Sequence, residues 1–527
     1  MSDGIVLVGL PGSGKSVVGR RVAEMLGRPF VDLDAEVERA TGRSVADLIA
    51  EAGEAAFRVA ESRAVQAACA IDGAVIAAGG GAVLDPLNRY AFMEHGMRVR
   101  LDADLDVLAA RLAADTVARP LLGDDRRAGL ERTATDRAGV YAAVDAAVDA
   151  SANVEAAAAT VIAATPFSKW RTLYDTPYAR YHSVGPEQGR VLMGRGLDRA
   201  ALSHALEPFA GREPVVIADR QVLPTLNEAL PSRRQCAMEG GERAKSFAEL
   251  ERLLTWLSEI GAERGDPLLA VGGGTIGDVA GLAAALHRRG MPLVQIPTTM
   301  LAQADSAIGG KVAIDLPAAK NAVGAIWPAW LIVSDIGLLE TLPVDRRRDG
   351  LAEALKCGLI GDAALWQLIE QRGRATLDGA DPAATYAITE RAARLKLAIV
   401  ERDPYENGER RSLNLGHTIG HALEVESGYA MAHGEAVGLG LRAVACIARN
   451  RGAETELAER IDALLASLSF PLHCRFDHAT VLTALGTDKK RERGVQRWIL
   501  PMAVGRVEEA SDVTDDEMTA ALTAISK

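Results

Sequence analysis

The sequence predicts an α/β protein whose C-terminal part is mainly helical. Two short apolar segments, residues 4–10 and 267–272, each lead directly into a glycine-rich loop and then into a helical pattern. This order of strand, loop and helix is typical of parallel sheets flanked by helices. Beyond Leu342 the pattern becomes mostly helical. We therefore expect two α/β regions, residues 1–165 and 166–341, followed by a helical region over residues 342–527.

The composition restricts the class of protein. The chain of 527 residues suffices for about three domains. It is 48% hydrophobic and 25% charged, as in a globular protein with an ample core. The net charge of −12, without a basic block, argues against a nucleic-acid partner. No apolar run reaches the length of a membrane span, so we expect no membrane partner.

The cysteines and the N-terminal residues predict a cytoplasmic protein. The five cysteines are scattered and form no C-x-x-C pair, and an odd count without a framework fits a reducing compartment. The N-terminal stretch MSDGIVLVGL begins directly with strand-like sequence and has no positively charged region. We therefore expect no signal peptide.

The first glycine-rich loop predicts a nucleotide-binding site. Residues 9–16, GLPGSGKS, match G-x-x-x-x-G-K-[ST] between a strand and a helix. In this setting the backbone N–H groups surround the β-phosphate, Lys15 reaches the β- and γ-phosphates, and Ser16 binds Mg²⁺. The predicted ATP-binding residues of the loop are Gly12, Ser13, Gly14, Lys15, Ser16 and Val17. A chance glycine-rich turn is the alternative, and the strand–loop–helix setting disfavours it.

Further candidate residues follow this loop. The predicted strand PFVDLD ends on Asp32 and Asp34, whose side chains would point the same way because strand side chains alternate. Arg58 and Glu61 share one face of a predicted helix. The remaining candidates are Gly80 at the end of a buried strand, Arg119 in a polar segment typical of a mobile lid, and Arg137 and Tyr141 on a helix. Taken singly, each arginine is more often a solvated surface charge.

Together these residues resemble shikimate kinase, over residues 1 to about 165. The resemblance implies a P-loop fold, a parallel sheet flanked by helices, that transfers the γ-phosphate of ATP to the 3-hydroxyl of shikimate. It implies that Arg58 and Arg137 clamp the shikimate carboxylate beside Gly80, and that Asp34 accepts or orients the hydroxyl proton. It also implies that Arg119 contacts ATP and stabilises the transferring phosphoryl group, and that Asp32 lies near Mg²⁺.

Two alternatives stay open for this first region. Another nucleoside-phosphate kinase would share the loop, although the D-L-D, F-R and G-G-G segments disfavour it. A non-catalytic regulatory nucleotide-binding module is the second, and the intact Lys15, Ser16 and Asp34 argue against it. Gly139 departs from the family, which usually has proline there. The alanine-rich residues 142–164 predict a helix, and a composition shift places the domain boundary near residues 165–166.

The second glycine-rich loop predicts another phosphate site. Residues 272–277, GGGTIG, contain G-x-G-x-x-G between a strand and a helix, which favours a pyrophosphate at the helix N-terminus. The usual fingerprint has an acid at the end of the next strand, but that strand ends on Thr298 and Thr299. The region is therefore not an ordinary dinucleotide-binding fold, and Asp219 is a candidate to bind the ribose.

Three histidines in the helical region predict a metal centre. His417 and His421 lie four residues apart, so on a helix they share one face, and His433 follows twelve residues later. Neutral imidazoles with a carboxylate suit Zn²⁺. Thr418 stands where the metalloprotease motif H-E-x-x-H has its glutamate, so a metalloprotease is disfavoured and the carboxylate comes from elsewhere. Histidines satisfied within a polar core are the alternative.

The best carboxylate candidate is Glu353, with Lys356 three residues later on the same helix face. Its segment LAEALKCG, together with NLGHTIGHALE and MAHGEAVGLG, resembles 3-dehydroquinate synthase, and the resemblance extends over about residues 167–527. It implies an α/β NAD-binding domain followed by a mainly helical metal-binding domain. It also implies that Glu353, His417 and His433 hold Zn²⁺ or Co²⁺, whereas His421 lines the substrate site.

The resemblance implies that NAD is bound by residues from several segments of the second region. These are Asp219, Gly240, Gly241, Glu242, Arg243, Ala244, Lys245, Gly274, Thr275, Ile276, Gly277, Asp278, Thr298, Thr299, Lys311, Lys320, Leu338, Leu339, Glu340 and Thr341. It also implies a set of residues that bind the substrate DAHP, a seven-carbon keto sugar-acid phosphate. These are Arg289, Asp305, Asn321, Lys396, Arg410, Asn414, His421 and one of Lys489 and Lys490.

The implied reaction converts DAHP to 3-dehydroquinate and phosphate, with Lys311, Lys356 and His421 in catalytic roles. NAD would oxidise a hydroxyl and be restored in each turnover, so the reaction has no net redox change. The family also implies a homodimer through this half, in which Arg289 reaches a neighbour's phosphate. A metal- and NAD-dependent polyol dehydrogenase is the alternative, and it would release NADH steadily.

Overall fold

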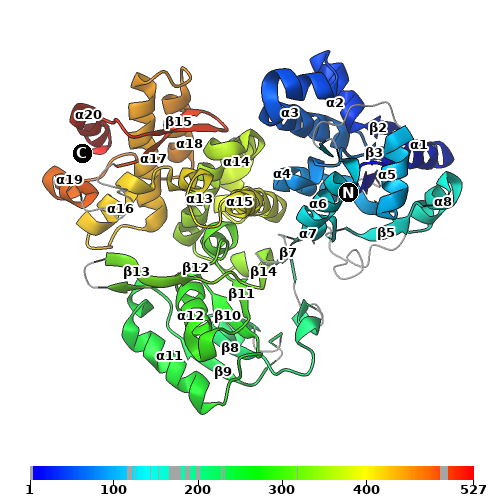
Figure 1. The fold of residues 1–527 in the computed structure, drawn as a ribbon. Helices are drawn as coiled ribbons and strands as arrows, with labels where there is room; N and C mark the ends of the chain where they lie inside the picture. The colour runs from blue at the N-terminus through cyan, green and yellow to red at the C-terminus, as the bar shows by residue number, and fades with distance from the viewer. Residues whose placement is uncertain are drawn as a thin grey trace. The chain divides into compact units, whose positions relative to one another are not determined.

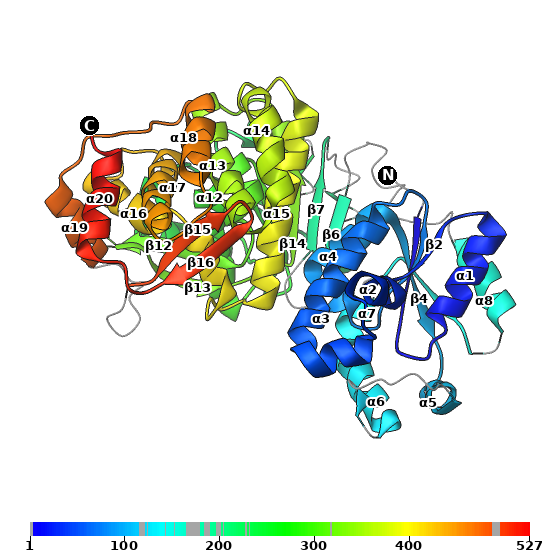
Figure 2. The same cartoon turned by 90° about the horizontal axis from the view of Figure 1, so that it is seen from above.

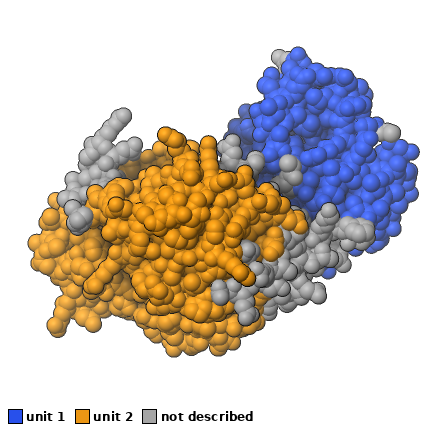
Figure 3. Space-filling model, turned by 90° about the horizontal axis from the view of Figure 1, so that it is seen from below, with its two compact units in different colours: residues 1–173 blue, residues 174–527 orange. Residues whose placement is uncertain are grey.

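The chain forms two compact units, residues 1–173 and 174–527 (Figure 3). The structure, a computed structural model, describes residues 4–114, 122–123, 125–142, 144–151, 153–164, 180–183, 190–196, 202–203, 205–226, 229–230, 232–316, 319–486 and 496–527. Residues 165–179 lie outside this range, so the exact boundary near residue 165 stays a prediction. No helix among the described residues is long and apolar enough to cross a membrane.

The first unit contains a five-stranded parallel sheet in the order β2-β3-β1-β4-β5. The strands are β1 (Gly4–Val8), β2 (Phe30–Asp32), β3 (Val75–Ala77), β4 (Gly96–Asp102) and β5 (Ala146–Asp149). The helices are α1 (Lys15–Leu26), α2 (Leu33–Thr41), α3 (Val45–Cys69), α4 (Pro86–His95), α5 (Leu105–Ala114), α6 (Arg126–Asp136), α7 (Ala138–Ala142) and α8 (Val154–Ala164).

Helices cover both faces of this sheet, which explains the continuous apolar sequence of β1. Val6 and Val8 of β1 pack into a cluster with side chains of α3 and α4. Ile5 and Leu7, which point to the opposite face, pack with side chains of α1 and α8. α3 and α4 lie on one side of the sheet, and α1 and α8 on the other (Figure 2). The central strand is therefore buried on both sides, and its carboxyl end carries the glycine-rich loop.

The alanine-rich segment after residue 142 is not wholly helical, and our prediction for its first part is wrong. β5 (Ala146–Asp149) pairs in parallel with β4, and α8 begins only at Val154. Alanine favours a helix by its intrinsic propensity, but pairing with the sheet edge outweighs this small preference.

The second unit begins with a seven-stranded sheet in the order β6-β7-β14-β11-β10-β8-β9. All neighbouring strands are parallel except β6 and β7. The strands are β6 (Arg180–Ser183), β7 (Arg190–Gly194), β8 (Val215–Asp219), β9 (Gln235–Met238), β10 (Leu268–Gly272), β11 (Leu293–Pro297) and β14 (Leu331–Asp335). The accompanying helices are α10 (Leu223–Leu226), α11 (Phe247–Glu259) and α12 (Gly274–Leu286). A hairpin of β12 (Lys311–Leu316) and β13 (Ala319–Ile326) packs on α12 (Figure 1).

The rest of the second unit is mainly helical. Its helices are α13 (Val344–Gly361), α14 (Ala363–Leu377), α15 (Pro382–Arg402), α16 (His417–Glu426), α17 (His433–Asn450), α18 (Leu457–Ser467), α19 (His478–Gly486) and α20 (Asp515–Ile525). A hairpin of β15 (Trp498–Ala503) and β16 (Arg506–Ala510) joins them. α17 lies at the centre and contacts α13, α16, α18 and α20. The predicted α/β class with a mainly helical C-terminal part is confirmed.

Candidate active sites

The glycine-rich loop of the first unit is shaped to surround an anion. Gly12 and Gly14 have φ angles of 82° and 89°, which side chains other than glycine rarely adopt. α1 begins at Lys15 without a side-chain cap, so the N–H groups of its first turn are available to a ligand. The Lys15 ammonium lies across the loop and donates to the carbonyl oxygens of Gly9 (3.0 Å) and Leu10 (3.1 Å). A phosphate in the loop would meet backbone N–H groups and this ammonium.

Asp32 and Asp34 do not end one strand, so our prediction of two parallel side chains is wrong. β2 stops at Asp32, whose carboxylate accepts the backbone N–H of Asp34 (3.1 Å) and caps α2. The capping interaction begins the helix and turns Asp34 out of the strand direction. The carboxylates of Asp34 and Glu61 instead both lie beside Gly79, just after the end of β3. A Cβ placed on Gly79 would lie 2.8 Å from the Asp34 carboxylate and 2.7 Å from that of Glu61.

The predicted shikimate residues come together at this point. The Arg58 guanidinium donates to Glu61 (2.7 Å), as their shared helix face predicted. Glu61 is only 2% exposed, and burial raises its pKa although Arg58 lies beside it. Arg137 donates to the carbonyl oxygen of Gly80 (2.5 Å), and the Tyr141 hydroxyl lies 2.6 Å from the same oxygen. Two guanidinium groups, two carboxylates and the glycine-rich loop therefore border one region. The remaining candidate, Arg119, lies outside the described residues.

In the second unit, three helices bring Glu353, His417 and His433 together. Their ligand atoms lie within 4.8 Å of one another. Glu353 of α13 places Oε1 3.2 Å from Nε2 of His417 in α16 and 3.2 Å from Nε2 of His433 in α17. Two imidazole nitrogens and a carboxylate oxygen suit Zn²⁺, whose catalytic sites keep a further position open for substrate. The predicted ligand set is therefore assembled in space.

The two histidines are oriented by the nitrogens that face away from Glu353. Nδ1 of His417 lies 3.1 Å from the Leu415 carbonyl oxygen, and Nδ1 of His433 lies 3.3 Å from the Glu424 carboxylate. Both partners can only accept, so each Nδ1 carries a hydrogen, and with a metal bound each Nε2 would present its lone pair to it. His421 has its ring centroid 5.2 Å from that of His417 and is not one of the three clustered ligands.

Buried charges surround the metal position. Although burial favours the neutral carboxyl, Lys356 and the histidines hold the pKa of Glu353 well below its usual range. Burial lowers the pKa of His433, but hydrogen bonds to Glu353 and Glu424 outweigh it and raise the pKa to about 10. Lys356 forms an ion pair with Glu353 and lies 3.6 Å from Asp305. A divalent cation would thus join a site that already contains one ionised carboxylate.

Lys396, Asp305 and Lys356 extend this buried network toward the predicted substrate residues. The Lys396 ammonium lies 2.7 Å from the Asp305 carboxylate and donates to the Asp305 carbonyl oxygen (2.8 Å). Asp305 therefore stands between two lysines, and the structure brings together three of the residues that the family resemblance assigned to the substrate site.

A further group of predicted substrate residues surrounds Glu406, which the sequence analysis missed. The Glu406 carboxylate pairs with Lys311 and accepts the side-chain amide of Asn414 (2.7 Å). Arg410 follows on the same segment and donates to the Gly309 carbonyl oxygen (3.0 Å). No local pattern distinguishes Glu406 from Glu409, which pairs with Arg402 instead. By contrast, Glu424 lies seven residues after His417, so helical spacing could have placed it on the ligand face.

Predicted cofactor residues meet at the carboxyl ends of β8, β10 and β11. A Cβ on Gly240 would lie 2.5 Å from the Asp219 carboxylate, and the Thr298 N–H donates to the Gly272 carbonyl oxygen (3.0 Å). α12 begins after Gly273 without a side-chain cap. We name this region the glycine edge; it consists of Asp219, residues 240–245, residues 272–274, Thr298 and Thr299. Ligands of open parallel sheets bind at such strand ends.

The remaining predicted cofactor residues lie around the glycine edge or beside it. Lys245 donates to Asp278 (2.7 Å) and to Asn321, and burial raises the pKa of Asp278 to about 6 although Lys245 opposes this. Lys320 of β13 lies 3.1 Å from Glu242. Leu338 and Leu339 belong to η7 (Ile336–Leu339), where Leu338 packs against the sheet core and Leu339 is buried; Glu340 pairs with Arg195, and Thr341 follows.

Three predicted substrate residues are not placed with these groups, two of them because they lie outside the described residues. Arg289 ends η5 (His287–Arg289) after α12, and the contacts of the described residues do not link it to the other substrate candidates. Lys489 and Lys490 lie outside the described residues. These three assignments stay predictions.

Comparison with known proteins confirms both resemblances. A family model for shikimate kinase matches residues 11–165. The models for the N-terminal and C-terminal parts of 3-dehydroquinate synthase match residues 235–349 and 350–491. The two synthase models meet immediately after Asp349, and the helical set with Glu353, His417 and His433 falls in the second.

Similar proteins cover most of the second unit. A 3-dehydroquinate synthase of Koribacter versatilis is 42% identical over 287 residues, which are 54% of this chain and 78% of that protein. A 2-epi-valiolone synthase of Actinosynnema mirum is 37% identical over 65% of this chain and 93% of its own length. The solved 2-epi-5-epi-valiolone synthase of Streptomyces hygroscopicus, with NAD⁺ and Zn²⁺ bound, is 29% identical with a TM-score of 0.61, covering 65% of this chain and 98% of that one. The chain therefore belongs to the 3-dehydroquinate synthase family and carries a shikimate kinase domain in front of the synthase.

Proposed function

We propose that the chain is a bifunctional enzyme of aromatic amino-acid (chorismate) biosynthesis. Its first unit phosphorylates shikimate with ATP and Mg²⁺, and its second converts DAHP to 3-dehydroquinate and phosphate with NAD and Zn²⁺ or Co²⁺. The observation that carries the synthase assignment is the cluster of Glu353, His417 and His433 beside buried lysines. It agrees with the two synthase family models.

In the kinase unit, the contacts of Lys15, Arg58 and Arg137 support the roles that the resemblance implies, and the Mg²⁺ roles rest on the resemblance. The loop N–H groups and Lys15 hold the phosphates, while Ser16 and Asp32 serve Mg²⁺. Arg58 and Arg137 bind the shikimate carboxylate, and Glu61 keeps the Arg58 guanidinium in place. Asp34, which converges with Glu61 at the end of β3, accepts or orients the proton of the attacking hydroxyl.

In the synthase unit, the bound groups supply two kinds of chemistry: NAD⁺ exchanges a hydride with the substrate, and the metal polarises the hydroxyl that is oxidised. Lys356 and Asp305, which lie beside Glu353, hold substrate hydroxyls near the metal position. Lys311 and Asn414 bind an anionic group of the substrate, and the Glu406 carboxylate holds both of these donors toward one point. His421 lines the same space beside His417.

A related chain is named a 2-epi-valiolone synthase, so the product of this chain has to be argued separately. The presence of a shikimate kinase domain on the same chain favours DAHP, because both activities then serve one pathway. The polyol dehydrogenase considered from the sequence is not favoured by the family models.

We also propose a homodimer formed through the synthase unit, with Arg289 reaching the substrate phosphate of the neighbour. Arg288 and Arg289 have φ angles of 48° and 63°, a left-handed backbone conformation that is uncommon for residues other than glycine. Light scattering of the full chain and of a fragment ending near residue 165 would test this, with a dimer and an active monomeric kinase expected. All five cysteines are free thiols, which supports a cytoplasmic location.

The decisive experiment mixes the full chain with DAHP, Zn²⁺ and substoichiometric NAD⁺ and measures free phosphate. Phosphate should exceed the amount of NAD⁺ many times over, with no accumulation of NADH. A parallel assay with ATP and shikimate should release ADP. Steady NADH formation without phosphate release would contradict the synthase assignment.

A further inference from the structure

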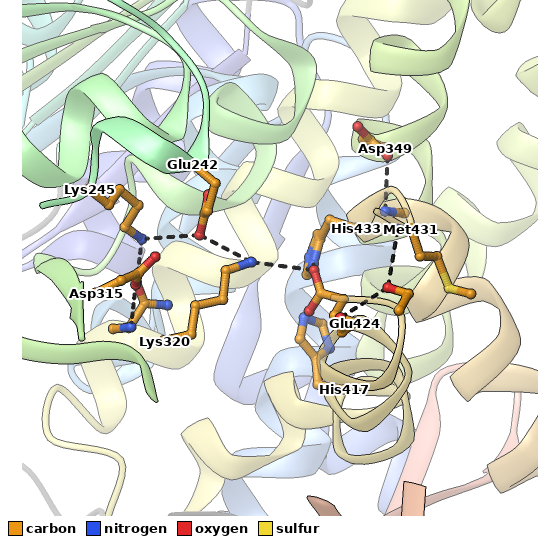
Figure 4. Close-up of polar contacts among 12 residues, drawn as sticks. Glu242, Lys245, Asp315, Lys320, Asp349, His417, Glu424, Met431 and His433 are labelled. Atoms are coloured by element: carbon orange, nitrogen blue, oxygen red, sulfur yellow. Dashed lines mark hydrogen bonds and ion pairs between the residues drawn. The ribbon is translucent and has the colours of Figure 1, made fainter. Parts of the chain in front are cut away.

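A continuous series of charged side chains joins the metal position to the glycine edge. Nδ1 of His433 lies 3.3 Å from Oε1 of Glu424, and the Lys320 ammonium lies 3.4 Å from the same oxygen. Lys320 also lies 3.1 Å from Oε1 of Glu242, which is 3.9 Å from the Lys245 ammonium. Figure 4 shows these side chains in one line, with His417 and His433 at one end and Lys245 at the other.

Glu424 holds the central place in this series. It lies on α16, seven residues after His417, and is only 3% exposed. A buried carboxylate is stable only when cations or hydrogen-bond donors surround it. Here one oxygen receives a hydrogen bond from a predicted metal ligand and an ion pair from a predicted cofactor residue. A change in either partner therefore acts on the same atom.

We propose that Glu424 is a positioning residue that couples metal binding to cofactor binding in the synthase unit. This inference rests on the proposed synthase function. Glu424 accepts the Nδ1 hydrogen of His433, so that Nε2 faces the metal, and it holds Lys320 beside Glu242 at the glycine edge. A metal on Nε2 would hold the His433 ring in one orientation, and its Nδ1–H would then hold Glu424 and, through it, Lys320.

The consequence is a reciprocal effect on affinity. If bound metal holds Lys320 in place, the side chain is already ordered before NAD⁺ binds. NAD⁺ binding then does not include the entropy cost of ordering Lys320, so metal strengthens it. By thermodynamic linkage, NAD⁺ must strengthen metal binding by the same factor. We expect a factor of roughly 5 to 150, the usual range of such coupling.

Three variants separate this role from a merely stabilising one. Glu424→Ala removes both interactions of the carboxylate. Glu424→Gln keeps an acceptor for His433 but loses the charge that attracts Lys320. Lys320→Met leaves the His433–Glu424 hydrogen bond and removes the link to the glycine edge. Glu426→Gln is the matched control, because Glu426 lies on the same helix and accepts the Asp477 backbone N–H (3.0 Å) instead.

The experiment measures Zn²⁺ affinity of the full chain by competition with a chromophoric chelator, without NAD⁺ and with saturating NAD⁺. NAD⁺ affinity of the metal-free and Zn²⁺-loaded protein, measured by calorimetry, gives the reciprocal factor. In the unsubstituted chain the two factors should agree and be at least about 5. Glu424→Ala should weaken Zn²⁺ binding at least about tenfold, and Glu424→Gln less.

The coupling, rather than either affinity, decides the outcome. Lys320→Met should retain the Zn²⁺ affinity measured without NAD⁺ within about twofold but lose the effect of NAD⁺ on it, and Glu424→Gln should reduce that effect. The control should match the unsubstituted chain. The proposal is overturned if the unsubstituted chain binds both ligands without coupling, or if the factor is unchanged in Glu424→Gln and Lys320→Met. Failure to bind Zn²⁺ and NAD⁺ at all would instead refute the proposed synthase function, and this inference with it.

Discussion

The backbone N–H of Gly434 donates to the Asp349 carboxylate across 2.9 Å, and this bond joins two helices that carry metal ligands. Asp349 lies one turn before Glu353 on α13, and Gly434 follows His433 at the start of α17. Ala432, at the N-cap of α17, offers no side-chain cap, so a carboxylate from another helix caps it instead. The close approach requires glycine, because a Cβ on Gly434 would lie 2.5 Å from the Asp349 Cα.

Gly434→Ala should separate α13 from α17 and weaken the metal site. Overlap with backbone atoms cannot be relieved by rotating a side chain, so we expect a loss of about 1–3 kcal/mol in stability. Bound Zn²⁺ should fall as His433 moves from Glu353. Thermal unfolding and metal analysis would measure both effects. Gly361→Ala at the end of α13 is the control, because its Cβ would meet only the Leu395 side chain, at 3.2 Å. Unchanged zinc content in Gly434→Ala would contradict the idea that this contact sets the ligand geometry.

Lys15→Met should abolish phosphorylation of shikimate and leave phosphate release from DAHP intact. The ammonium of Lys15 spans the glycine-rich loop of the first unit, and every contact that we assign to the kinase site lies within residues 1–173. Coupled assays for ADP and free phosphate on the same preparation would show the separation. Loss of both activities in a folded Lys15→Met protein would mean that the two sites depend on each other.

His417→Ala should lower bound zinc together with synthase activity, whereas His421→Ala should lower activity and retain most of the zinc. Nε2 of His417 lies 3.2 Å from the Glu353 oxygen, and His421 is not one of the three clustered ligands. Metal analysis after dialysis, with kinase activity as the control for folding, distinguishes the two. Equal loss of zinc in both variants would remove the basis for assigning the ligands as we do.

Glu406→Gln should reduce phosphate release from DAHP without changing zinc content. The substitution leaves Lys311 without its carboxylate partner and weakens the orientation of Asn414. Hydrogen bonds to charged groups contribute about 1.5–3 kcal/mol, so we expect a decrease of roughly 10- to 100-fold in kcat/KM. Glu409→Gln is the matched control, because Glu409 pairs with Arg402 (2.6 Å). Equal effects of the two substitutions would show that Glu406 has no special role.

Asp278 should make the stability of the second unit fall as the pH rises from about 4 to 6. Burial raises its pKa from 3.8 to about 6, so over this window the folded protein retains a proton that the unfolded chain has lost. Unfolding then releases a proton, and a higher pH favours it. The effect is at most about 3 kcal/mol. Asp278→Asn should remove this part of the pH dependence, which urea unfolding at several pH values would measure. An identical pH profile in the variant would show that the carboxyl is ionised throughout.

The sequence determined the parts of each site that depend on near neighbours along the chain. The loop at residues 9–16 and the glycines at 272–274 both lie between a strand and a helix, as predicted. The four-residue spacing placed His417 and His421 on one helix, with ring centroids 5.2 Å apart. Such contacts follow from helix and strand geometry alone. The regular backbone of a helix or strand determines where residues a few positions apart lie relative to each other. Family resemblance added the ligand set, which the structure assembles.

Local patterns were misleading where neighbouring elements competed. The strand pattern of PFVDLD continued to Asp34, but the Asp32 carboxylate caps α2 and ends the strand two residues earlier. The alanine-rich residues after 142 favoured a helix, but pairing with β4 made residues 146–149 a strand. A local capping hydrogen bond in the first place, and pairing with another strand in the second, outweighed a propensity that contributes less than about 1 kcal/mol per residue.

Only the tertiary structure decided which distant partners the buried acids contact. Glu353 lies 80 residues from His433 along the chain, and Glu424 lies 104 residues from Lys320, yet both pairs are within 3.4 Å. Nothing in the local sequence distinguishes Glu406 from Glu409 or Asp349 from other helix acids. Each role arises from the tertiary contacts: α13, α16 and α17 pack around Glu353 and Glu424, whereas Glu406 finds its partner Lys311 on β12. The periodicity of residues along one helix or strand does not indicate which residue of another element a buried charge will contact.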